Sequence, residues 1–94
     1  MTRMMGKPNS EDAEVIAQVV RNVRTLRRVR NISQEKLAQL CEVSVGAIAG
    51  FEQGQVRTSF FMVIRIARAL GVDLATLLKP DLLNSRFPRQ MRVM

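Results

Sequence analysis

Apolar residues recur at helical spacing in two long stretches of the chain. The first stretch follows Ser10, a residue type that caps helices, and the second follows Ser59. The apolar positions of the first are Val15, Ile16, Val19, Val20, Val23 and Leu26. Those of the second are Phe60, Val63, Ile64, Ala67 and Leu70. The pattern predicts helices over residues 11–29 and 59–70, with these side chains facing a core.

Three shorter helices are predicted from their start signals. In each, a Ser or Asp stands at the cap, with an apolar residue just before it and another four residues after it. Such a pair contacts across the cap and sets the angle at which the chain enters a helix. The caps and pairs are Ser33 with Ile32 and Leu37, Ser44 with Val43 and Ile48, and Asp73 with Val72 and Leu77. They predict helices over 34–41, 45–52 and 74–79.

The expected fold is therefore an all-α domain of five helices over residues 10–79. Residues 1–9 lack periodicity and are interpreted as a flexible arm. Residues 80–94 form a tail in which apolar residues alternate with arginine, and residues 92–94 have a composition compatible with a short strand. With 94 residues, one small domain is expected.

Charge and residue usage narrow the function. The net charge is +7, and twelve of the fifteen cations are arginine, which binds phosphate oxygens in pairs. There is no histidine and only one cysteine, Cys41, so common general bases and metal clusters are missing. We expect no enzyme, no metal and no cofactor. Without a membrane span or signal peptide, a cytoplasmic protein is expected, with nucleic acid or an acidic molecule as partner.

Only three residues, Glu42 to Ser44, join the second and third predicted helices. A joint this short forces a steep crossing, as in a helix-turn-helix over residues 34–52. Five matches resemble the Cro/C1-type family of phage repressors in order and distance: Ile32 to Ala38, Val43-Ser44, Ile48, Phe51 to Gly54, and Ile66 to Val72. The resemblance covers about residues 20–79 and implies a lambda-repressor-like DNA-binding domain, usually a homodimer.

The resemblance also implies roles for individual residues. Gln34 matches the family's phosphate-binding glutamine, and the loop after the third helix matches a segment that touches the DNA backbone. Arg27 and Glu52 match a structural ion pair. The residues expected to contact double-stranded DNA are Gln34, Lys36, Ser44, Val45, Gly46, Ala49, Gln53, Gln55 and Arg57.

The third helix departs from the family where bases are read. Its matching positions are Val45, Gly46, Ala47, Ala49 and Gly50, none of which has a side chain that donates a hydrogen bond to a base. Val45 or Ala49 can still contact the methyl group of a thymine. At Gly46 and Gly50, the bare backbone can approach the bases closely. Sequence preference would then rest on the flanking loop and on DNA deformability. Glu42 stands where the family usually has glycine, which indicates backbone strain or a modified turn.

Several residues have less specific interpretations. Arg24 and Arg28 share one face of the first helix and are either solvated or near the DNA backbone. Cys41 is expected to be a small buried residue rather than a redox switch. Phe61 and Met62 lie beside the inward stripe of the fourth helix, where either the tail covers them or they are exposed.

The sequence thus predicts a DNA-binding transcription regulator. Phe61, Met62, Leu78 and Leu82 are the expected homodimer surface, because exposed apolar patches usually mark interfaces. Such a dimer would bind an inverted repeat and regulate its own promoter. The alternative is an antitoxin, or a regulator that acts mainly by binding a protein partner, and the poor base-reading capacity of the third helix favours it.

Overall fold

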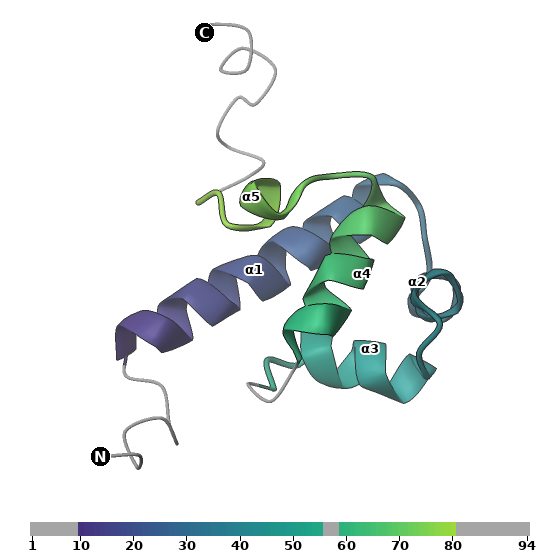
Figure 1. Cartoon of the computed structure of the whole chain (residues 1–94), viewed down its shortest axis with the longest axis horizontal. Coiled ribbons are helices and arrows are strands. Elements are labelled where there is room, and N and C mark those ends of the chain that lie inside the picture. The colour runs from purple at the N-terminus through teal and green to yellow at the C-terminus, as the bar shows by residue number, and fades with distance from the viewer. Residues whose placement is uncertain (1–9, 56–58, 81–94) are drawn as a thin grey trace, which may run out of the picture.

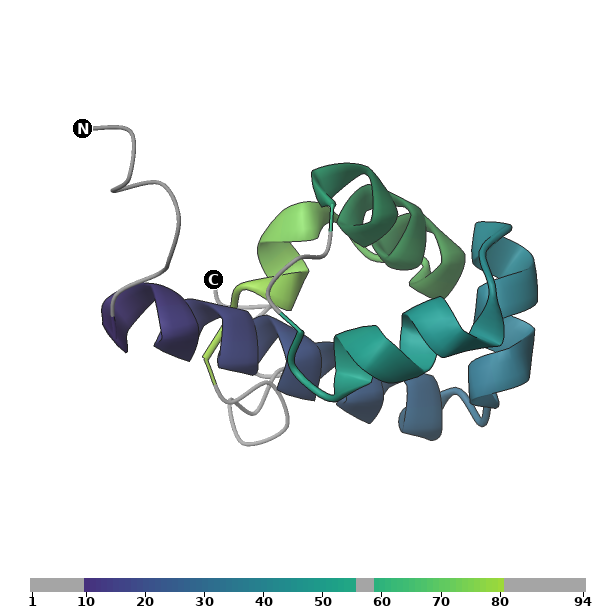
Figure 2. The same ribbon diagram turned by 90° about the horizontal axis from the view of Figure 1, so that it is seen from below.

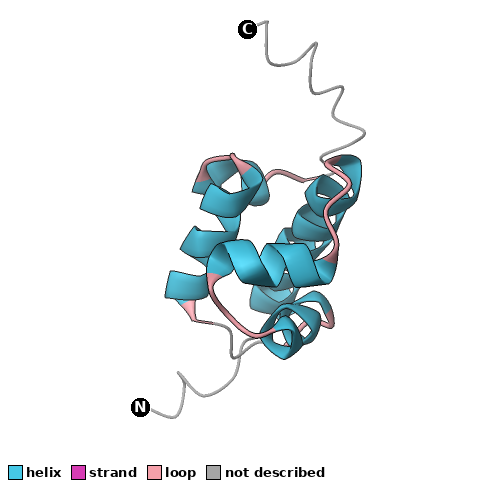
Figure 3. Cartoon of the chain, turned by 90° about the vertical axis from the view of Figure 1, so that its right-hand side faces the viewer, coloured by secondary structure: helices cyan, strands magenta, loops and turns pink. Residues whose placement is uncertain are grey.

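The computed structural model describes residues 10–55 and 59–80, and every regular element in them is a helix (Figures 1 and 3). The predicted all-α fold is therefore confirmed. Arg57, Leu82 and the strand considered for residues 92–94 lie outside the described residues. The helices are α1 (Ser10–Val29), α2 (Gln34–Cys41), α3 (Val45–Glu52), α4 (Phe60–Leu70) and α5 (Leu74–Leu77).

Three helices begin directly after their predicted caps, Ser33, Ser44 and Asp73. The side chains of Ser33, Ser44, Ser59 and Asp73 each accept a hydrogen bond from the backbone N–H three residues onward. Each cap supplies an acceptor to a first-turn N–H that has none within the helix. Three details differ from expectation. Ser59 precedes α4 as its cap instead of lying inside the helix. Ser10 is the first residue of α1 rather than a residue before it, and α5 ends at Leu77, two residues early.

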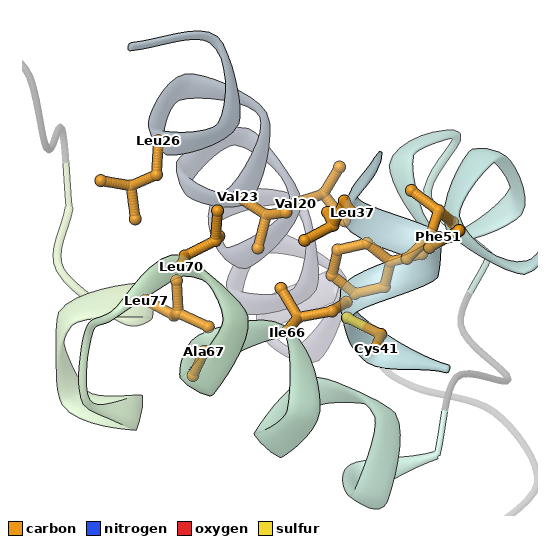
Figure 4. Packing of buried hydrophobic residues seen from close by; sticks show 12 residues of the cluster. Val20, Val23, Leu26, Leu37, Cys41, Phe51, Ile66, Ala67, Leu70 and Leu77 are labelled. Atoms are coloured by element: carbon orange, nitrogen blue, oxygen red, sulfur yellow. The ribbon is translucent and has the colours of Figure 1, made fainter. Parts of the chain in front are cut away.

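One apolar core joins all five helices. Figure 4 shows buried side chains of α1, α2, α3, α4 and α5 pointing toward one another. Cys41 is among them, as expected, and burial raises the pKa of its thiol, against a smaller lowering by the charge of Arg65. The buried apolar residues are Val20, Val23, Leu26, Leu37, Ala38, Cys41, Ile48, Phe51, Ile66, Ala67, Leu70 and Leu77.

Two apolar positions assigned to the core face the solvent instead. Phe60 is the first residue of α4 and is 65% exposed, and Val15 in the second turn of α1 is also exposed. The core-facing side of α4 is made by Ile66, Ala67 and Leu70, with Met62 and Val63 packed against them. The predicted core-facing positions were thus wrong near the N-terminal ends of α1 and α4. There the helix extends beyond the elements that it packs against.

The helix pair α2–α3 has the steep crossing that the short joint predicted. Figure 1 shows α2 end-on while α3 runs across the view, and Figure 2 shows α3 alongside α1, which it contacts. Glu42 makes the turn in a left-handed conformation with φ of 61°. A residue with a side chain adopts this conformation at some cost, which confirms the strain expected for a non-glycine residue here.

A buried asparagine ties α1 to the end of α5. Asn22 is 2% exposed, and its Nδ2 donates to the carbonyl oxygens of Leu77 (2.8 Å) and Lys79 (2.7 Å). Its Oδ1 accepts from Gln18 Nε2 at 3.1 Å. These bonds satisfy carbonyls left free where a helix ends. Within the described part of the chain, no helix is long and apolar enough to cross a membrane.

Candidate DNA interface

A bidentate ion pair holds α1 against α3. Arg27 donates from Nε to Glu52 Oε2 at 2.7 Å and from Nη2 to Glu52 Oε1 at 3.0 Å. Its Nη1 donates to the carbonyl oxygen of Ile32 at 2.9 Å. The side chains are 12% and 4% exposed, respectively. The pair that the resemblance implied is therefore present, and it also fixes the loop before α2.

Gln34 belongs to the same network. It is the first residue of α2, and its Nε2 donates to Glu52 Oε1 at 3.0 Å. Burial opposes ionisation of Glu52, but the hydrogen bonds from Arg27 and Gln34 and the charges of Arg27 and Arg24 outweigh it. The pKa of Glu52 therefore lies below its ordinary value. Glu52 stays ionised and holds one amide hydrogen of Gln34.

These residues line a concave surface between α1, the start of α2 and the end of α3. We call it the polar hollow. Its volume is about 430 Å³, and it brings together three residues predicted to contact DNA: Gln34, Ala49 and Gln53. The remaining members are Arg24, Arg27, Arg28 and Glu52. The structure thus places Arg24 and Arg28, left open by the sequence, beside the candidate DNA-binding residues.

The exposed side of α3 offers almost no polar side chain. Val45 is 43% exposed, Gly46 is exposed and Ala49 is partly exposed. The hydroxyl of Ser44 accepts the N–H of Ala47 at 3.1 Å, so it serves first as a cap. Lys36, one turn into α2, is exposed. Among the predicted contact residues that the structure describes, none is buried, and no exposed side chain of α3 carries a hydrogen-bond donor.

Gly50 does not offer an open backbone to a ligand. It is buried, and a Cβ built there would lie 2.7 Å from Oε1 of Gln55. The side chain of Gln55 covers the backbone at Gly50, so close approach of DNA there would require Gln55 to move aside. At Gly46 a Cβ would meet only Ser44 Oγ, at 3.8 Å. Of the two glycines, only Gly46 leaves room for a ligand.

Sequence reasoning missed the role of Arg65, which braces the turn of the helix-turn-helix. Its Nη1 donates to the carbonyl oxygen of Cys41 at 2.9 Å and lies 3.8 Å from Oε1 of Glu42. Its guanidinium stacks on Phe61, with Cζ 4.3 Å from the ring centroid. Arg65 of α4 thus supplies a donor to the last turn of α2. No spacing rule links α4 to that carbonyl.

Apolar side chains gather on another surface, which we call the apolar groove. It has a volume of about 290 Å³ and lies between α1, the end of α3, α4 and α5. Leu78 lines it together with Phe60, whereas Phe61 and Met62 do not. Phe61 is 61% exposed and Met62 packs against the core. The residues that line the apolar groove are Val15, Ile16, Val19, Phe51, Gln55, Phe60, Val63, Leu74, Leu77 and Leu78.

Comparison with known proteins agrees with this geometry. A family model described as helix-turn-helix, of the Cro/C1 type, matches residues 23–77. The solved structure of a hypothetical transcription factor, NHTF from Neisseria, is similar, with a TM-score of 0.69 and 25% identity over 93% of this chain and 91% of that one. No curated protein matches the sequence. The chain therefore belongs to the Cro/C1-type helix-turn-helix family of DNA-binding transcription regulators.

Proposed function

We propose that the protein is a sequence-specific transcription regulator that binds an inverted-repeat operator as a homodimer and regulates its own promoter. The observation that carries this proposal is the polar hollow, in which the Arg27–Glu52 pair orients Gln34 beside Ala49 and Gln53. An amide held this way is preorganised to donate its second hydrogen to a phosphate oxygen. Such contacts set the register of a protein on DNA. A cytoplasmic location follows from this role.

The contacts we propose divide into two kinds. Gln34, Lys36, Gln53, Gln55 and Arg57 would bind the sugar–phosphate backbone, which supplies affinity without sequence information. Ser44, Val45, Gly46 and Ala49 would face the major groove. For Val45, Gly46 and Ala49, only apolar contact with thymine methyls and close backbone approach favour one base over another. Most sequence discrimination would then come from DNA shape.

Homodimer formation supports this function, because a single domain that makes few contacts with bases binds DNA poorly. Joining two copies makes the second contact intramolecular, and two-fold symmetry places the two α3 helices about 34 Å apart on a near-palindromic site. The proposed surface comprises Phe61, Met62, Leu78 and Leu82. Phe61 and Leu78 are exposed, as such a surface requires.

A footprint on the DNA upstream of the protein's own gene tests the proposal, together with binding to random duplex at several salt concentrations. We expect a protected near-palindrome. Gln34→Ala should weaken specific and random binding alike and leave the salt slope unchanged, because the amide carries no charge and neutralises no phosphate. Gln39→Ala is the matched control, since Gln39 is an exposed glutamine on the same helix that does not line the polar hollow. Equal effects of the two variants would contradict the role given to Gln34.

A second candidate function is a regulator that acts mainly by binding a protein, in the manner of an antitoxin. The apolar groove and the nearly apolar exposed face of α3 favour it. Co-purification of a second polypeptide, with no salt-dependent binding to any duplex, would select this function over the first.

A further inference from the structure

Exposed apolar side chains converge on the apolar groove. Val15, Phe60 and Leu78 line it and are 52%, 65% and 53% exposed, respectively. Among the described residues of its lining, Gln55 is the single polar one. Apolar surface that gathers in one place usually contacts another segment or molecule. Of the described residues in the proposed dimer surface, only Leu78 lines the groove, so most of the groove has no assigned occupant.

A second concave surface adjoins the groove along α1. It has a volume of about 550 Å³ and shares Val15 and Leu78 with the groove. The described chain ends at Pro80, which lines this second surface. Residues 81–94 therefore start beside the groove. An extended chain allows Leu83 to lie up to about 11 Å from Pro80, and Phe87 up to about 25 Å, so both side chains can reach the groove.

Charge complementarity points to the same segment. The start of α1 carries three carboxylates, those of Glu11, Asp12 and Glu14, and Glu14 lines the second concave surface. Arg21, the cation that lines this surface, donates to Gln18 Oε1 at 2.8 Å. Residues 81–94 contain three arginines and one aspartate. The acidic start of α1 and this basic segment therefore attract one another, and salt screens the attraction.

Covalent connection favours this segment over a separate molecule. Residues 81–94 follow Leu78 by only three positions and contain apolar side chains such as Leu83 and Phe87, which suit an apolar lining. A segment joined by so short a connection meets the groove at an effective concentration on the order of millimolar. A second copy or a separate protein would have to exceed this concentration, or bind more tightly, to occupy the groove first.

We propose that residues 81–94 bind the apolar groove of their own subunit, with Leu83 and Phe87 against its apolar lining and the arginines beside the acidic start of α1. The inference goes beyond the proposed function and does not rest on it. Phe61, Met62 and Leu82 stay in the proposed dimer surface. A partner protein that used the groove, as in the second candidate function, would first have to displace residues 81–94.

Paramagnetic broadening of methyl resonances tests the site, with a nitroxide attached through Gln90→Cys. Cys41 stays unlabelled, because it is 1% exposed and burial raises the pKa of its thiol. Val15 reports on the groove, and Val29 is the matched control. Both are exposed valines of α1, and they lie about 21 Å apart along the helix axis. The nitroxide should broaden the methyl resonances of Val15 strongly and those of Val29 weakly.

Phe87→Asp should release the segment from the groove. The broadening of Val15 should then be lost, and the protein should bind more of an apolar fluorescent dye. Asn84→Asp is the matched control, because it adds the same negative charge to residues 81–94 without removing an apolar side chain. It should leave both signals unchanged, and circular dichroism checks the helix content of both variants. Added salt should weaken the broadening of Val15 in part, since it screens the arginine–carboxylate attraction.

A mixture of nitroxide-labelled protein with isotope-labelled protein that lacks the nitroxide shows whose segment fills the groove. Broadening of Val15 should be present when both labels are on one chain and absent in the mixture. Broadening in the mixture would mean that the segment of a second copy fills the groove. That result overturns the inference, as does equal broadening of Val15 and Val29, or a Phe87→Asp variant that keeps the broadening.

Discussion

The polar hollow and the apolar groove lie on one small domain but differ in how firmly their side chains are held. In the hollow, Arg27, Glu52 and Gln34 are joined by hydrogen bonds of 2.7–3.0 Å. In the groove, Phe60 and Leu78 project with more than half of their surfaces exposed. Hydrogen bonds thus fix the side chains of the hollow, whereas Phe60 and Leu78 stand exposed at the rim of the groove.

This difference separates two requirements of a DNA-binding regulator. Placing a donor against a phosphate needs fixed direction, and a network of charged hydrogen bonds provides it. Association with a second apolar surface needs exposed area and tolerates rearrangement of side chains. The predictions below test whether the two surfaces behave independently, in order of their expected effect on the free energy of unfolding.

The largest effect is expected from Arg27→Ala, which leaves Glu52 buried without its partner. Removing one member of such a pair costs about 3–5 kcal/mol in a buried site. Urea unfolding should show this loss, and DNA affinity should fall with it because Gln34 loses its fixed carboxylate. Lower affinity at unchanged stability would mean that Arg27 itself binds phosphate and that the pair contributes little to the fold.

The same pair predicts a pH dependence. The pKa of Glu52 is lowered in the folded protein, so the stability it contributes is present above its unfolded pKa and is lost as pH falls through the folded value. Urea unfolding at a series of acidic pH values should show this decline in the wild type. Glu52→Gln should flatten it, since the amide does not titrate in this range.

Asn22→Ala is expected to lower stability by about 2 kcal/mol, because the carbonyls of Leu77 and Lys79 lose their donor. Gln18→Ala is the control, since it removes the bond to Asn22 Oδ1 and an exposed bond from Arg21 but leaves the two carbonyls with their donor. Leu77 and the adjacent Leu78 line the apolar groove and not the polar hollow, so DNA binding through the hollow should survive at temperatures where the variant is folded. Loss of DNA binding in folded Asn22→Ala would show that the two surfaces are coupled.

Gly46→Ala should stabilise the fold by up to about 1 kcal/mol, because alanine favours the helix and its methyl group meets only Ser44 Oγ at 3.8 Å. Gly50→Ala should gain less, since Gln55 must move away from a contact of 2.7 Å. Thermal unfolding measures both. If DNA approaches the backbone of α3, Gly46→Ala will weaken DNA binding although it stabilises the protein; unchanged binding would contradict close approach.

Phe61→Glu should change stability by less than about 0.5 kcal/mol, as for most surface substitutions, yet convert dimers into monomers and abolish operator binding. Light scattering gives the mass, and circular dichroism checks the helix content. Phe60→Glu is the neighbouring control, because Phe60 lines the groove and Phe61 does not. Monomers from Phe60→Glu alone would move the interface to the groove.

Local signals in the sequence determined the helices and their starts. Caps such as Ser33, Ser44 and Asp73 act within one turn, so their neighbours in sequence are their neighbours in space. The steep joint at Glu42 was predictable for the same reason. The resemblance supplied the Arg27–Glu52 pair, which lies 25 residues apart and has no local signature.

Only the tertiary structure decided where each exposed side chain lies relative to distant elements. Helical periodicity could not show that Phe60 projects past the core, because periodicity gives direction around an axis and not where the neighbouring helices end. Nor could periodicity predict that Arg24 and Arg28 lie beside Gln34, or that the side chain of Gln55 covers Gly50. These contacts depend on the angles at which the five helices pack, and those angles follow from the whole core.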